Sequence, residues 1–125
     1  MNKLENPFHF DEIKIHGNAK ITYNDLREFV QGGPRIGKMS VNGVEIPNYL
    51  FGGPCLLHED FAYAPVYVRK LLGVGFKIAQ IDIHNLGVLI LGKTQDFIFL
   101  DHVENNSIFY FDDMEMSNIK SCQYQ

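Results

Sequence analysis

Long hydrophobic runs and tryptophan are missing from this sequence of 125 residues, and cysteine is scarce. No apolar run approaches the roughly 20 residues that a membrane-spanning helix needs. The charged N-terminal stretch lacks the apolar core of a secretory signal. Two cysteines, Cys55 and Cys122, are too few for a disulfide framework, so we expect reduced thiols. These absences predict a cytoplasmic protein without a membrane segment, and the length predicts a single domain over residues 1–125.

Basic residues are scarce in the C-terminal third of the chain. Residues 1–81 contain nine Lys and Arg against eight Asp and Glu, whereas residues 82–125 contain two against seven. The net charge is therefore +1 in the first part and −5 in the second. Because phosphate contacts need Lys and Arg, this segment argues against a nucleic-acid partner and allows a basic protein partner. A solvated sheet edge with its turns is the alternative explanation of the same charges.

Short apolar runs separated by polar or glycine-containing breaks fill residues 75–112. The runs are GFKIAQIDI, VLIL, DFIFLDHV and SIFYFD. Their β-branched and aromatic content favours strands joined by tight turns, which is an antiparallel meander. The predicted fold class is α+β, mainly β. We expect an antiparallel sheet of about six to eight strands that curls into a small barrel or sandwich, with one short helix packed on it.

The helix is predicted at residues 22–32. Thr22 and Asp25 resemble a capping box, and Gly32 and Gly33 followed by Pro34 would end the helix. Four apolar residues between these signals share one face at helical spacing. They are Tyr23, Leu26, Phe29 and Val30.

Strands are predicted on both sides of this helix. Residues 13–21 and 37–46 have the pattern of hairpins, and Asn42-Gly43 is the strongest two-residue signal for a type I′ turn. Residues 63–73 are ambiguous between helix and strand, and their Val-Tyr-Val run favours a strand. Residues 113–120 are predicted to be a short terminal helix or a frayed tail.

No catalytic or metal motif is convincing. Residues 32–39 match G-x-x-x-x-G-K, but Met39 stands where a phosphate loop needs Ser or Thr, and a hairpin follows in place of a helix. The five histidines lack metal-binding spacings, and the His-Glu-Asp run at residues 58–60 would alternate faces on an extended chain. Cys55 lies in an apolar run that is typical of a core. We therefore expect no enzyme, no cofactor and no metal.

Two stretches carry a resemblance to a known class of proteins. FGGPCLLHEDFAYAPVYVRKLLGVGFKIAQIDI and FIFLDHVENNSIFYFDD resemble small cytoplasmic immunity proteins of bacterial toxin–immunity pairs. The similarity covers residues 49–113 and lies in size, acidic balance, an aromatic-rich sheet and an acidic C-terminal third. It implies a non-enzymatic inhibitor that binds a cognate toxin domain. Many such toxins are nucleases with basic clefts, to which an acidic surface is complementary.

The predicted contact patch combines acidic residues at the ends of two neighbouring strands with one tyrosine. Its members are Asp101, Glu104, Tyr110, Asp112 and Asp113. The phenylalanines of the same strands are expected to face the core, because alternate positions of a strand must face inward. These phenylalanines are Phe97, Phe99, Phe109 and Phe111.

Two other functions stay open at this point. One is a small β-barrel or sandwich domain that binds an apolar small molecule in a cavity lined by Phe and Tyr. The other is a structural or assembly subunit that dimerises through an exposed sheet edge or face. A monomer and a homodimer are both compatible with the sequence.

Overall fold

Strands form all the regular structure in the described part of the chain. The computed structural model describes residues 5–28, 31–70 and 73–123, and none of these belongs to a helix. The strands are β1 (Ile13–His16), β2 (Ala19–Glu28), β3 (Arg35–Val41), β4 (Val44–Glu45), β5 (Leu56–His58), β6 (Phe61–Lys70), β7 (Gly73–Asp82), β8 (Val88–Gln95), β9 (Phe99–Glu104), β10 (Ser107–Phe111) and β11 (Ile119–Gln123). They pair antiparallel in three sheets, with the orders β1-β2-β3-β4, β5-β6-β7-β8 and β11-β10-β9.

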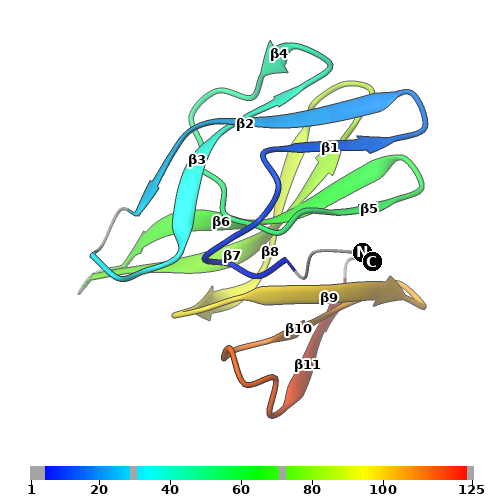
Figure 1. Cartoon of the computed structure of the whole chain (residues 1–125). Coiled ribbons are helices and arrows are strands. Elements are labelled where there is room, and N and C mark those ends of the chain that lie inside the picture. Colours follow the sequence, from blue (N-terminus) through cyan, green and yellow to red (C-terminus); the bar gives the residue numbers. More distant parts are fainter. Residues whose placement is uncertain (1–4, 29–30, 71–72, 124–125) are drawn as a thin grey trace.

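The three sheets are stacked as layers, which Figure 1 shows from top to bottom as the upper sheet (β1–β4), the middle sheet (β5–β8) and the lower sheet (β9–β11). The first core lies mainly between the upper and middle sheets. Its buried residues are Phe10, Ile21, Tyr23, Met39, Val41, Ile46, Phe51, Cys55, Ala62, Ala64, Val66, Ala79 and Ile81. The second core lies mainly between the middle and lower sheets. Its buried residues are Ile36, Tyr63, Phe76, Ile78, Ile98, Leu100, Ile108 and Tyr110.

The middle sheet is largely apolar on both faces, which explains the uninterrupted apolar run of residues 61–68 in β6. Along β6, Ala62, Ala64 and Val66 face the first core, and the alternating Tyr63 and Tyr67 face the second. A strand with one solvated face would alternate apolar and polar residues. The small side chains on the first face allow the upper sheet to approach closely.

Replacing Ala64 by leucine is expected to lower the free energy of unfolding by about 1–3 kcal/mol, because added methylenes have no room in a packed core. Ala64 lies directly opposite Ala79 on β7, and both side chains are fully buried. Urea unfolding at neutral pH measures the change. The matched control is Arg69→Leu, which adds the same side chain at an exposed position of β6. A loss below about 0.5 kcal/mol for Ala64→Leu would contradict close packing of these sheets.

Several sequence predictions are confirmed. Asn42 and Gly43 join β3 to β4 with φ angles of 51° and 86°, as a type I′ turn requires. The hairpin at residues 13–21 is β1 and the start of β2, and the ambiguous residues 63–73 fall in β6 and the first residue of β7, apart from residues 71–72, which lie outside the described residues. Both cysteines are free thiols.

The predicted helix at residues 22–32 is wrong within the described residues, because β2 occupies this stretch up to Glu28. Phe29 and Val30 lie outside the described residues. The register of β2 against β3 shifts between Asn24 and Arg27, and Asp25 has a φ of 57°. This β-bulge inserts residues into the strand, so that Tyr23 and Leu26 reach the first core three positions apart. A spacing of three imitates a helical face.

The strands of the predicted meander are present, but they do not all pair with their neighbours in sequence. Strands β7 and β8 pair with each other, and so do β9 and β10, but β8 and β9 belong to different sheets. None of the three sheets closes into a barrel. Residues 113–118 form turns and coil before β11, so the terminal helix is also wrong. The described residues contain no helix that could cross a membrane.

Candidate functional site

The lower sheet has one face toward the core and one toward solvent. Leu100, Ile108 and Tyr110 belong to the second core, so the residues between them along the strands point outward. Phe109 and Phe111 are therefore on the outer face of β10, where they are half-buried. The expectation that the phenylalanines of these strands fill the core is wrong, because isoleucine, leucine and tyrosine occupy those positions.

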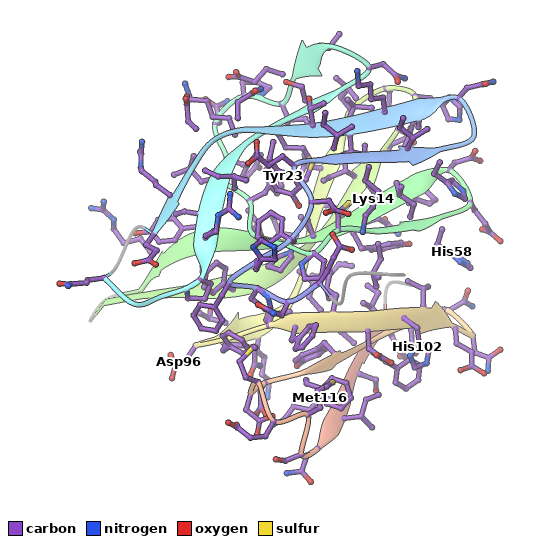
Figure 2. All side chains as sticks on the ribbon, viewed as in Figure 1. Lys14, Tyr23, His58, Asp96, His102 and Met116 are labelled. Carbon is purple, nitrogen blue, oxygen red and sulfur yellow. The ribbon has the colours of Figure 1, made fainter. Side chains whose placement is uncertain are left out.

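A carboxylate–histidine cluster lies on β9 and consists of Asp101, His102 and Glu104. His102 Nδ1 is 2.6 Å from Asp101 Oδ2, and its Nε2 is 3.3 Å from Glu104 Oε1. The imidazole stacks on the Phe109 ring with 4.6 Å between centroids and 8° between planes. An imidazole with a proton on each nitrogen donates to both carboxylates, and a neutral one donates to only one of them. Figure 2 shows His102 near the C-terminal end of β9.

A β-bulge explains why two carboxylates reach one histidine. Phe109 pairs with His102 and Tyr110 pairs with Leu100, so Asp101 is the extra residue on β9. A bulge turns the local chain and changes the direction of its side chains. Asp101 can therefore contact its neighbour His102 instead of pointing to the opposite face.

The aromatic rings of the outer face form a strip of two successive cross-strand pairs. Phe99 and Phe111 are directly opposite each other on β9 and β10, with ring centroids 6.3 Å apart in an edge-to-face arrangement. The Phe109–His102 stack is the next outward-facing pair along the same two strands. Ile119 on β11 lies opposite Phe111 and is 50% exposed, which widens the strip.

Asp112 and Asp113 lie at the other end of the strip. Glu104 pairs with Ser107, whereas Phe111 pairs with Phe99, so Asp112 is roughly 15 Å from Glu104 along the strands at ~3.3 Å per residue. Asp112 forms an ion pair at 3.1 Å with Lys120 of β11, and Asp113 accepts a hydrogen bond from the Ser117 backbone N–H. The predicted patch is thus divided into two acidic ends with the aromatic strip between them.

Tyr110 is the predicted site residue that the structure places away from the surface. Its side chain faces the second core and is buried. Burial raises the pKa of the Tyr110 hydroxyl, and the nearby Lys120 opposes this rise. Four further residues face outward here and were not predicted to do so from the sequence: Phe99, His102, Phe109 and Phe111. The Asn105-Asn106 turn indicates the pairing of Ser107 with Glu104, but it does not decide which face of the two strands points to the core.

The net charge of the chain is concentrated in this layer. From residue 97 to the last residue, the sequence contains five Asp and Glu against one Lys, which is a net charge of −4. Residues 1–96 contain equal numbers of acidic and basic residues. The acidic character of the protein therefore belongs to the lower sheet and its loops.

An open cleft of about 550 Å³ lies at the turns that connect strands of the upper and middle sheets. Its polar lining residues include His16, Asn18, Asn42, Asp60 and His84. His84 Nε2 is 3.1 Å from Asp60 Oδ1, and both side chains are more than two-thirds exposed. The His-Glu-Asp run thus forms a polar turn. Across residues 5–28, 31–70 and 73–123, no three His, Cys, Asp or Glu side chains gather in an arrangement that could hold a metal ion.

Comparison of this chain with protein-family models, with curated proteins and with solved structures finds no match.

Proposed function

We propose that this chain is a non-enzymatic protein-binding module whose contact surface is the outer face of the lower sheet. The partner is a protein domain with a basic surface. In its most concrete form, the proposal is that the chain is an immunity protein that binds and neutralises a cognate bacterial toxin, such as a basic nuclease domain. This form follows from the resemblance of residues 49–113 to such proteins.

The observation that carries the proposal is an aromatic strip between two acidic ends on the layer that holds the net charge. The Phe99–Phe111 pair is half-buried in the free chain, and a partner could cover the part that is exposed. Large aromatic side chains are the usual anchors of protein interfaces. Carboxylates around them speed the encounter with a basic surface and disfavour wrong partners.

The carboxylate–histidine cluster adds a site that suits a cationic side chain. Asp101 and Glu104 expose 44% and 62% of their side chains, although both contact His102. An arginine of the partner could bind these oxygens and stack on the neighbouring rings, because guanidinium groups combine both kinds of contact.

A small apolar ligand has less support than a protein partner. A crevice lined by Pro7, Pro65, Phe76 and Ile98, among others, has no space that a water-sized molecule could enter. Pockets for drug-sized ligands usually need roughly 300–1,000 Å³. The larger cleft at the turns is open to solvent, and charged and polar side chains line it together with apolar ones, which does not suit a purely apolar molecule.

Neutralising the two acidic ends is expected to weaken partner binding about 10- to 100-fold, since each exposed charge pair contributes roughly 0.2–1 kcal/mol. The variant combines Asp101→Asn, Glu104→Gln, Asp112→Asn and Asp113→Asn. Immobilised chain captures the partner from a lysate of the cells that produce it, and titration of the purified partner gives the Kd at about 50 mM and about 500 mM salt. The wild-type affinity is expected to fall with salt, and that of the variant much less.

The matched control removes the same number of charges from the upper part of the molecule. It combines Asp11→Asn, Asp25→Asn, Glu28→Gln and Glu45→Gln, all at exposed positions. Equal weakening by both variants would show general attraction between opposite charges and would contradict a contact surface on the lower sheet. The immunity form has its own test: the captured partner, expressed alone, should stop growth, and co-expression of this chain should restore it.

A further inference from the structure

The outer edge of β1 has backbone groups without a partner in the described residues. In the β1–β2 hairpin, the Tyr23 N–H donates to the Glu12 carbonyl at 2.8 Å, and residues 12 and 23 are directly opposite in the register. Hydrogen-bonded pairs recur at every second position of an antiparallel ladder. Lys14 and His16 therefore bond to β2, whereas the N–H and C=O groups of Ile13 and Ile15 point away from the sheet.

The side chains along this edge are apolar on one face. On the other face, the charge of Lys14 is balanced by an ion pair with Glu5. Ile13 and Ile15 are 53% and 69% exposed. Lys14 points between the upper and middle sheets, as Figure 2 shows, where its Nζ lies 2.6 Å from Glu5 Oε1 and 3.0 Å from the Cys55 carbonyl oxygen. An exposed, regular strand edge with free N–H and C=O groups is a template for another strand.

Two of the other edge strands, β8 and β9, are protected against such pairing. Strand β9 has the bulge at Asp101 and the two exposed carboxylates of its cluster. The pairing of β8 is shifted by a bulge, and its Gly92 has a φ of 79°. Bulges and charges are the usual devices that block edge-to-edge association. The β1–β2 register, in contrast, is regular from Ile13 to His16.

We propose that β1 pairs antiparallel with β1 of a second copy of this chain, about a two-fold axis at Lys14. The self-complementarity of the edge is the argument for this occupant. In this register, Ile13 lies opposite Ile15 of the second copy and their outward backbone groups bond. On the other face, Glu12 lies opposite His16 of the second copy, which places a carboxylate against an imidazole at both ends. A shift to another allowed register loses one or both kinds of pair.

The central lysines do not oppose this dimer. Each Lys14 ammonium group is turned toward its own Glu5 and is therefore held apart from that of the second copy. The paired segment is short, so the dimer is weak, with a Kd of about 10–100 µM. Because the upper sheet is separated from the lower sheet by the middle layer, both acidic outer faces stay free in the dimer (Figure 1).

Sedimentation velocity from about 5 µM to about 500 µM tests the proposal. The wild-type chain is expected to shift from monomer to dimer over this range. Ile15→Pro removes an N–H that the hairpin does not use, so this variant is expected to stay monomeric while keeping its fold by circular dichroism. Val44→Lys changes another exposed apolar residue of the upper sheet, 56% exposed, and is expected to dimerise like the wild type.

A second readout identifies the strand directly. The amide protons of Ile13 and Ile15 are expected to exchange at least tenfold more slowly at high than at low protein concentration, because pairing protects them. If Ile15→Pro does not fold, the double variant Ile13→Lys, Ile15→Lys replaces it. A wild-type chain that stays monomeric at 500 µM, or a folded β1 variant that still dimerises, overturns the proposal and leaves the proposed contact surface untouched.

Discussion

Replacing Phe10 by alanine is expected to lower the free energy of unfolding by about 3–5 kcal/mol, the range for removing a buried phenylalanine. Phe10 belongs to the segment that precedes β1, and its side chain is 3% exposed. Its ring centroid lies 4.9 Å from that of Tyr23, and the Arg35 guanidinium lies over the Phe10 ring at 5.4 Å. A Cβ atom at Gly53 would come within 2.7 Å of the ring. The ring therefore fills its site completely, and truncation leaves a cavity.

Two variants make this prediction specific. Phe8→Ala, in the same segment, removes a ring that is 37% exposed and only stacks on Phe97, so we expect a loss of about 1 kcal/mol or less. Gly53→Ala forces the Phe10 ring to move and is expected to destabilise by about 1–3 kcal/mol. Urea unfolding of the three variants gives the order. If Phe10→Ala cost no more than Phe8→Ala, the segment would not be part of the first core.

The helix error shows why spacing alone cannot identify this stretch. Within β2, Ala19, Ile21 and Tyr23 are buried at every second position, which is a strand pattern. The bulge at Asp25 then moves Leu26 to the same face. The bulge is stabilised from outside the segment, since Gly37 of β3 fits against it: a Cβ there would lie 2.6 Å from the Asn24 carbonyl oxygen. The sequence of residues 22–32 alone therefore cannot reveal the bulge, because the bulge depends on a glycine in the neighbouring strand.

The wrong prediction of which faces of β9 and β10 are buried has a different cause. Ile98, Leu100 and Ile108 alternate with phenylalanine, so both faces of these strands are apolar and a period of two fits either assignment. The larger aromatic residues were the natural choice for the core. The structure places the aliphatic residues there, and this leaves the rings of Phe99, Phe109 and Phe111 as the outward strip.

The assignment of the strands to three stacked sheets was also not predictable from the sequence, although most of the strands were. Tight turns such as Asn42-Gly43 fix a hairpin locally, because their positive φ angles select the residues. The segment between β8 and β9 has no such turn signal. Whether β9 joins the sheet of β8 or a different sheet depends on packing between distant segments. The acidic residues of the candidate site were recognisable by composition, but their division into two ends depends on the register of the β9–β10 pair.

Alkaline pH is expected to destabilise the fold through Cys55. Burial raises the pKa of its thiol from 9 to about 12, with a smaller opposing effect of Lys14. The unfolded chain ionises this thiol near its ordinary pKa, so the unfolded state loses the proton first. The stabilising contribution is complete below pH 9 and is lost as the pH rises toward 12. Three pH units at about 1.4 kcal/mol each correspond to a loss of about 4 kcal/mol.

The variant Cys55→Ala isolates this effect from the other groups that titrate at high pH. Burial also raises the pKa of Tyr23, so both proteins lose stability above pH 10. Urea unfolding under reducing conditions at pH 8 and pH 11 is expected to show an extra loss of about 3 kcal/mol in the wild type relative to Cys55→Ala. Cys122→Ala is the control, because that thiol is half-buried on the lower sheet and its ionised form is partly hydrated. Parallel pH profiles for the wild type and Cys55→Ala would mean that water reaches Cys55, and that the first core is not closed where Lys14 meets the Cys55 carbonyl oxygen.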